Sequence, residues 1–158
     1  MKRIEVKKGE ILQRKGDLGS KVYQVESGLL RSYSIDEKGK EHIYQFAPEN
    51  WIIADATTNN IPCELFIDCL EDSIILEIEK DFNFLSSEPL KLVKRLSVLQ
   101  QRIIMLMSAS AIERYENFIN TYPNIVQRVP QRMIAAYLGV TPETLSAAKK
   151  AWYKNQNI

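Results

Sequence analysis

The sequence predicts an α+β protein in which an N-terminal jelly roll (a double-stranded β-helix) is followed by a long helix and a helix-turn-helix. Apolar and polar residues alternate before about residue 83, and after it apolar residues recur every three to four positions. Glycines divide the first half into many short strands with no intervening helix. Such a pattern is typical of an antiparallel sandwich or jelly roll rather than of a parallel sheet.

Three strands are the clearest in the first half. Alternation is most regular over 31–35 and 42–46, and a further strand is predicted over 73–78. The stretch between the first two, 36–40, is polar and includes Gly39, which can adopt a positive φ. We therefore expect the first two strands to form a β-hairpin.

A long helix is predicted to begin at Ser86-Ser87-Glu88-Pro89, where capping residues precede a proline. Its apolar positions are spaced by four, three, four and three residues. This average repeat is that of a coiled-coil seam, so the stripe is a candidate dimerisation surface. A helix packed on its own domain is the alternative, because the run is short for a coiled coil. The stripe consists of Leu92, Leu96, Leu99, Ile103 and Leu106.

Three shorter helices are expected in the rest of the chain. The first covers about 109–122 and is ended by Pro123. The second covers 130–138, and the third runs from Pro142 to about residue 153. The turn between them begins with a glycine and ends with Thr141, a favourable N-cap before a proline at the first helical position. A helix, a short turn and a capped helix form the helix-turn-helix pattern.

Charge is distributed unevenly along the chain. The 158 residues carry 21 basic and 20 acidic side chains, for a net charge of +1. Residues 1–82 contain 11 basic and 16 acidic side chains, whereas residues 83–158 contain 10 and 4. Within 121–158, five cations accompany a single acid, Glu143. This positive field favours binding to DNA phosphates, and a solvated basic face without a ligand is the alternative.

Helical spacing separates two faces of the last helix. Leu145, Ala148 and Trp152 share one face and are expected to pack inward. In a major groove, an outward carboxylate can accept from a cytosine amino group, and small side chains can contact methyl groups. The base-edge candidates are Glu143, Ser146 and Ala147. Contacts to phosphates position a protein without reading sequence. The phosphate candidates are Gln131, Arg132, Thr141, Lys150 and Lys154.

Other function classes are disfavoured by the composition. Cys63, Cys69 and the single histidine, His42, form neither a disulfide framework nor a zinc site of the usual spacing. A cupin-type enzyme would need several histidine ligands, and no phosphate loop of P-loop spacing occurs. No apolar run is long enough to span a membrane. We expect a cytoplasmic, non-enzymatic protein without a cofactor, a metal or a membrane partner.

Short motifs over nearly the whole chain are similar to those of one family. In the first half they are Lys8-Gly9-Glu10 with Gly16-Asp17, VYQVESGLLRSY (22–33), Gly39-Lys40-Glu41 and Pro48-Glu49-Asn50-Trp51. In the second half they are ERYENF (113–118), Arg128-Val129-Pro130-Gln131 and AAYLGVTPETLS (135–146). In these motifs the chain resembles the Crp/Fnr family of transcription regulators, especially its branch common in Bacteroidetes.

The resemblance implies a role for each segment. Residues 1–82 would form a cyclic-nucleotide-binding-like β-roll that acts as a sensor domain. Residues 83–108 would form a dimerisation helix, and residues 109–158 a helix-turn-helix DNA-binding domain. The implied protein is a homodimeric transcription regulator. Its implied partners are double-stranded DNA, a second copy of itself, and an unknown small-molecule effector or none.

The chain departs from the family pattern in the ligand site. Nucleotide-binding members have a phosphate cassette with a Gly-Glu and an Arg-Ala pair, and the corresponding stretch, 51–69, has neither. Nine acids and no Lys or Arg lie between Lys40 and Lys80, so an anionic phosphate would be costly to bind there. We expect no binding of cyclic AMP or cyclic GMP. Any effector pocket would be aromatic, with ordinary core packing as the alternative. Its candidate residues are Tyr23, Tyr33, Tyr44, Phe46, Trp51 and Phe66.

Two further departures concern the cysteines and the last helix. Two cysteines do not supply the four thiolates of an Fnr-type iron–sulfur cluster. Family members usually have an arginine where this chain has Ala147, and many begin a β-wing near the position of Ile158. The alternative function is therefore a degenerate dimeric sensor or protein-interaction module that no longer binds DNA.

Overall fold

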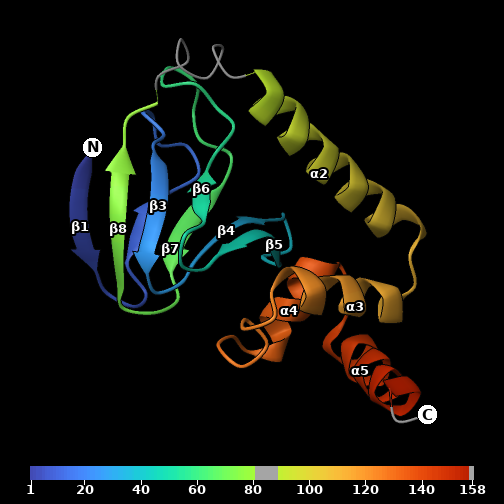
Figure 1. Ribbon diagram of the computed structural model, residues 1–158. Coiled ribbons are helices and arrows are strands. Elements are labelled where there is room, and N and C mark those ends of the chain that lie inside the picture. Colours follow the sequence, from blue (N-terminus) through green and yellow to red (C-terminus); the bar gives the residue numbers. More distant parts are fainter. Residues whose placement is uncertain (81–88, 157–158) are drawn as a thin grey trace. The chain divides into compact units, whose positions relative to one another are not determined.

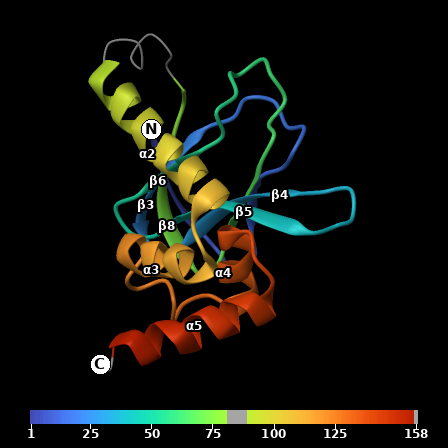
Figure 2. The same ribbon diagram turned by 90° about the vertical axis from the view of Figure 1, so that its right-hand side faces the viewer.

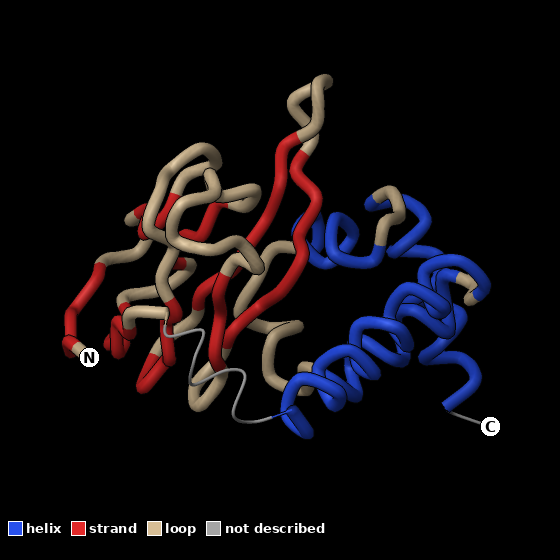
Figure 3. Tube along the Cα trace, turned by 90° about the horizontal axis from the view of Figure 1, so that it is seen from above, coloured by secondary structure: helices blue, strands red, loops and turns tan. Residues whose placement is uncertain are grey.

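Strands and helices occupy different halves of the chain. The computed structural model describes residues 1–80 and 89–156, apart from the side chains at positions 89, 91, 92 and 95. The chain divides into two compact units, Met1–Lys80 and Asp81–Ile158. The described strands all lie in the first unit and the described helices in the second (Figure 3). The predicted α+β fold class is confirmed. The predicted helix-start residues Ser86, Ser87 and Glu88 lie outside the described residues.

The first unit consists of two four-stranded antiparallel sheets (Figure 1). One sheet has the strand order β1-β8-β3-β6, and the other has the order β2-β7-β4-β5. This is the predicted jelly-roll type of architecture, since neighbours in a sheet are distant in sequence. The bounds are β1 Lys2–Val6, β2 Ile11–Gln13, β3 Val22–Ser27, β4 Leu30–Ile35, β5 Glu41–Ala47, β6 Ile52–Ala54, β7 Phe66–Cys69 and β8 Ser73–Ile78.

An apolar core joins the two sheets. Val25, Ile53 and Ile75 come from the first sheet, and Leu30 and Ile67 from the second, and all five are fully buried in one cluster. Alternation along each strand produces this arrangement, because successive side chains point to opposite faces of a sheet. Burial of such side chains, at roughly 1.5–3 kcal/mol each, is the main stabilising contribution to this unit.

The predicted hairpin is formed by β4 and β5, which pair antiparallel from Leu30↔Ala47 to Ile35↔Glu41. The Asp36 carboxylate accepts hydrogen bonds from the N–H groups of Lys38 and Lys40, each at 2.9 Å. Gly39 has φ +76°, a conformation that side chains other than glycine's rarely adopt. The Asp36 hydrogen bonds and the conformation of Gly39 therefore stabilise the predicted loop between β4 and β5.

A second glycine is required by space as well as by backbone conformation. Gly28, between β3 and β4, has φ +96°. A β-carbon at this position would collide with the Ser73 side chain and lie 2.8 Å from the Asp72 carbonyl oxygen. The β3–β4 connection therefore packs directly on the start of β8, which brings the two sheets together at this end.

The second unit contains α2 (Pro89–Ser108), α3 (Ala111–Thr121), α4 (Gln131–Leu138) and α5 (Pro142–Gln156), of which α3, α4 and α5 lie together in Figure 2. The prediction placed the start of α3 at 109, which is two residues too early. Ser110 is its N-cap, and a capping box with Glu113 begins the helix at Ala111. Pro130 precedes α4 as its N-cap, and α5 continues beyond the predicted residue 153.

Aromatic rings dominate the core of the helical unit. Phe118, Tyr122 and Tyr137 are all buried, with ring centroids 5.4–5.5 Å apart. Tyr115 is also buried and meets the Trp152 ring edge-to-face at 6.0 Å. These contacts join α3 to both α4 and α5 and give the short helices a common core.

Candidate functional site

The turn between α4 and α5 has the geometry of a helix-turn-helix. Gly139 follows α4 in the left-handed conformation, with φ +67°, and its N–H donates to the Ala135 carbonyl. The Thr141 hydroxyl then caps α5 by accepting from the Thr144 N–H at 3.2 Å. A glycine that ends one helix and a threonine that caps the next reverse the chain within three residues.

The two faces of α5 differ sharply in burial. Leu145 and Ala148 are buried, at 0% and 4% exposure, and Trp152 is half-buried. The structure brings the base-edge candidates and two phosphate candidates onto one accessible face. Their contacts with DNA remain a prediction. The side chains predicted to face outward are all exposed: Glu143, Ser146, Ala147, Lys150 and Lys154.

The remaining phosphate candidates lie at the starts of the two helices. Gln131 and Arg132 are exposed in the first turn of α4, and Thr141 is exposed before α5. The Thr141 hydroxyl is already engaged in capping, which holds its position. Thr144 is also exposed and was not among the candidates, although it lies three residues before Ala147 and hence on the same side of the helix.

Glu143 is ionised at neutral pH. Its pKa is lowered below the ordinary value because the carboxylate accepts from its own backbone N–H and from the Thr141 hydroxyl. A carboxylate at a helix N-terminus is also favoured by the helix dipole. The residue therefore presents an acceptor on a face that otherwise carries cations and small polar groups.

The apolar stripe on α2 is largely accessible. Leu96 and Ile103 are 65% and 58% exposed, and Leu106 is half-buried. The Leu92 side chain lies outside the described residues. Further apolar side chains with more than half of their surface exposed are Leu90, Val93, Val98, Ile104 and Met107. A contiguous apolar surface of this kind is typical of a protein interface.

In the stretch between β6 and β7, a carboxylate accepts from three backbone N–H groups. Asp55 is 5% exposed and accepts from the N–H groups of Thr57, Glu64 and Leu65 at 3.0, 2.9 and 2.8 Å. Burial alone would raise its pKa, but these N–H groups hold the pKa below the ordinary value. The loop thus contains an anion of its own.

A buried arginine pairs with two of the acids in 41–79, although this range itself contains no Lys or Arg. Arg31, in β4, is 6% exposed and donates to both oxygens of Asp68 at 2.9 and 3.0 Å, and to Glu41 at 2.6 Å. Burial opposes its charge, yet these carboxylates raise the pKa of Arg31 above its ordinary value. Strand pairing between β4 and β7 brings Arg31 opposite Asp68. Counting charges within one segment of the sequence does not detect such a pair.

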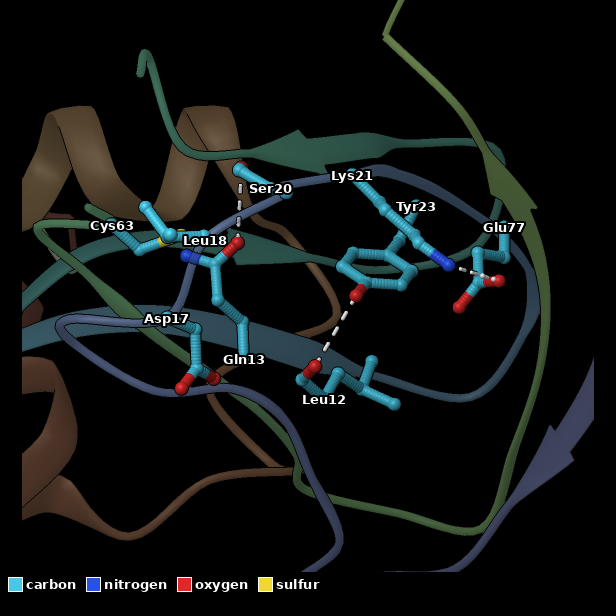
Figure 4. A pocket seen from close by; sticks show the side chains of 10 residues that line it. Leu12, Gln13, Asp17, Leu18, Ser20, Lys21, Tyr23, Cys63 and Glu77 are labelled. Carbon is cyan, nitrogen blue, oxygen red and sulfur yellow. Dashed lines mark hydrogen bonds and ion pairs between the residues drawn. The ribbon is translucent and has the colours of Figure 1, made fainter. Parts of the chain in front are cut away.

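A pocket of about 210 Å³ opens in the first unit between the 12–23 segment, Cys63 and Glu77 (Figure 4). Its polar groups are bonded to one another: Ser20 Oγ donates to Gln13 Oε1 at 3.1 Å, and Lys21 pairs with Glu77 at 2.8 Å. Of the six aromatic candidates, Tyr23 lines this pocket and the other five do not. The structure brings together two of them, Tyr33 and Phe66, whose rings stack at 5.3 Å.

Comparison with known proteins identifies the first unit. Residues 3–84 match the family described as the cyclic nucleotide-binding domain. The chain belongs to the cyclic nucleotide-binding domain family. It is 29% identical over 164 aligned positions to an anaerobic regulatory protein of Aggregatibacter actinomycetemcomitans, covering 89% of this chain and 63% of that protein. It is equally similar to the fumarate and nitrate reduction regulatory protein of Yersinia pestis, covering 89% and 64%. The chain thus spans less than two thirds of these relatives.

Solved structures extend the likeness to both units. FixK2 from Bradyrhizobium japonicum matches 98% of this chain and 85% of its own, with a TM-score of 0.82 at 19% identity. A transcriptional regulator of the CRP/FNR family from Thermus thermophilus, TTHA1359, matches 98% and 87%, with a TM-score of 0.76 at 16% identity. These comparisons confirm the predicted resemblance to the Crp/Fnr family and its fold.

In this member of the cyclic nucleotide-binding domain family, two groups that could hold an anion already have carboxylate partners. Three N–H groups of the β6–β7 stretch donate to Asp55, and Arg31 donates to Asp68 and Glu41. A phosphate that bound to either group would have to displace these carboxylates. Among the described residues, no cluster of His, Cys, Asp and Glu is arranged to hold a metal ion. None of the described helices has the length and hydropathy needed to cross a bilayer.

Proposed function

We propose that this protein is a homodimeric, DNA-binding transcription regulator of the Crp/Fnr type, from the Bacteroidetes-type branch. The observation that carries the proposal is the accessible face of α5, where Glu143, Ser146 and Ala147 lie beside Lys150 and Lys154. The opposite face is buried through Leu145 and Ala148, so the helix can present the first face to a major groove.

Two further findings support this function. The relatives that match most of the chain are named as regulatory proteins. The exposed apolar stripe on α2 supplies a surface on which a second copy can pair, with Leu96 and Ile103 at its centre. Dimerisation would place two copies of α5 on successive turns of a duplex. A DNA-binding role also implies a location in the cytoplasm and no catalysis.

The β-roll acts in this proposal as a sensor domain that takes neither cyclic AMP nor cyclic GMP. Its phosphate-binding stretch is satisfied internally by Asp55, and its buried arginine by Asp68 and Glu41. An effector, if one is used, would have a different chemistry. The aromatic group around Tyr33 and Phe66 remains the candidate site for it.

The test is fluorescence anisotropy with a pool of labelled promoter fragments over a series of salt concentrations. The wild-type protein should bind with an affinity that falls steeply as salt rises, because phosphate contacts release counterions. Reversal of both cations of the accessible face (Lys150→Glu with Lys154→Glu) should weaken binding by at least about 100-fold and reduce the logarithmic salt slope by about four, two for each subunit of the dimer.

The matched control is Lys38→Glu, which reverses an exposed lysine in the β4–β5 turn. This variant should bind as the wild type does. Absence of salt-dependent binding by the wild type, or an equal loss in the control, would contradict the proposal. The first of these outcomes would favour the interaction module instead.

A further inference from the structure

One arginine of α3 connects three segments of the helical unit. Arg114 guanidinium N–H groups donate to the carbonyl oxygens of Leu106 at 2.7 Å, Ala109 at 3.0 Å and Leu138 at 3.0 Å. Leu106 lies in the last turn of α2, and Leu138 is the last residue of α4. Carbonyls at these positions have no partner within their own helix. A single side chain therefore caps the ends of two helices.

A second arginine, from α2, reaches the same end of α4. The Arg102 guanidinium lies 4.0 Å from the centroid of the Tyr137 ring and donates to the Tyr137 carbonyl at 3.4 Å. Arg102 and Leu106 are four residues apart and share one face of α2. The last turn of α4 contains no basic residue of its own. Its C-terminal dipole is thus complemented by cations from α2 and α3.

The turn of the helix-turn-helix lies directly against this cluster. A β-carbon at Gly139 would lie 3.7 Å from Arg114 Nη1 and 3.9 Å from Leu106 Cδ2. After Gly139, only Val140 and Thr141 separate these contacts from the first turn of α5. Leu106, expected from its spacing to serve the dimer seam, therefore also lies beside the turn, within reach of any side chain placed at position 139.

We propose that Arg114 is a positioning residue, which together with Arg102 attaches the 139–141 turn to the end of α2 and so sets the orientation of α5. The proposal rests on the DNA-binding function above and adds a specific link within it. Arg114 does not itself contact DNA. In a dimer paired along α2, the spacing of the two α5 helices would depend on this attachment.

The first experiment compares the DNA affinity of Arg114→Ala with that of Arg132→Ala across a salt series. Loss of a phosphate contact at Arg132 should reduce the salt slope by about two, one for each subunit of the dimer. Arg114→Ala should weaken binding at least about tenfold with the slope unchanged, because the number of phosphate contacts stays the same. Arg114→Lys should not restore binding, since one ammonium cannot span carbonyls of three segments. Full rescue by lysine would overturn the proposal in favour of a simple charge effect.

The second experiment needs no DNA. Spin labels at exposed positions 101 in α2 and 155 in α5 report the distance between the helices by electron–electron double resonance. The labelled protein is mixed with an excess of unlabelled protein so that each dimer has one labelled chain. Arg114→Ala should broaden a narrow distance distribution, and an unchanged distribution would overturn the proposal.

The two experiments fail in different ways. If the wild type does not bind DNA, the proposed function is wrong, while the spin-label distances still decide whether Arg114 fixes the turn. If Arg114→Ala does not fold by circular dichroism, Arg102→Leu replaces it, because that variant removes one contact to α4 and keeps Arg114. A broadened distribution in Arg102→Leu supports the link, and an unchanged one contradicts it.

Discussion

The β-roll and the helix-turn-helix use their charged residues in opposite ways. In the β-roll, charges are paired within the fold, as in the Arg31–Asp68 pair and the Lys21–Glu77 pair. In 121–158, five cations accompany one acid, and Arg132 and Lys154 are exposed. Paired charges of the first kind maintain a structure, whereas the exposed side chains of Arg132 and Lys154 are accessible to a partner. The net charge of +1 conceals this difference.

The comparison predicts that a charge removed from the β-roll will cost stability rather than DNA affinity. Asp68→Ala leaves Arg31 buried with only Glu41 as a carboxylate partner, so the free energy of unfolding should fall by about 3 kcal/mol. Urea denaturation monitored by circular dichroism measures this loss. Binding of the folded variant to DNA should be unchanged.

Two controls separate the buried pair from ordinary surface charge. Lys7→Ala removes an exposed pair with Asp72 and should leave unfolding nearly unaffected. Arg31→Met combined with Asp68→Leu removes both members of the buried pair and should recover at least half of the lost stability, since no charge of that pair is left without a partner. A loss of similar size in Lys7→Ala would contradict the distinction between paired and available charges.

A smaller effect, of about 2 kcal/mol, is expected for Asp55→Asn, because a neutral amide replaces the charged, buried acceptor of three N–H groups. The folded pKa of Asp55 is lower than its ordinary value of 3.8. The contribution of the carboxylate is therefore fully present above about pH 4 and disappears as the pH falls through the folded pKa.

The measurement is the difference in unfolding free energy between wild type and Asp55→Asn at several pH values. The difference should be constant from about pH 5 to 7 and shrink at lower pH. Asp17→Asn, whose side chain accepts one exposed N–H bond from Arg14, is a control that should show a much smaller difference. If the difference in unfolding free energy between wild type and Asp55→Asn stays unchanged below the folded pKa of Asp55, the carboxylate charge is not the cause of that difference.

The fold class and the buried and exposed faces of α5 follow from local sequence patterns. Alternation defines the hairpin strands, glycine and threonine define the helix-turn-helix turn, and helical spacing separates Leu145 from Lys150. The ends of elements depend on local side-chain chemistry too, and the start of α3 was misplaced because the Ser110–Glu113 capping box was overlooked.

Contacts between distant segments were not predictable in this way. Arg31 and Asp68 are 37 residues apart, and Arg114 and Leu138 are 24 apart. Their meeting depends on strand order and helix packing, which periodicity does not specify. The range 41–79 does contain nine acids and no Lys or Arg, but the pairing of β4 with β7 places Arg31, from outside this range, opposite Asp68. The DNA-contact roles assigned to the outward residues of α5 stay predictions.

For cyclic AMP and cyclic GMP we expect no effect at all. Neither nucleotide should give binding heat in isothermal titration calorimetry, with any Kd weaker than about 1 mM. The same nucleotides should leave the Tm unchanged, because a ligand stabilises only a fold that it binds. Micromolar affinity would contradict this prediction and would indicate that the N–H groups bonded to Asp55, or the Arg31 guanidinium, exchange their carboxylate partners for a phosphate. Glu41→Gln with Asp68→Asn tests this directly, because it keeps side chains of similar shape around Arg31 while removing both competing charges. If binding emerges only in that variant, internal pairing is what separates this β-roll from nucleotide-binding members of its family.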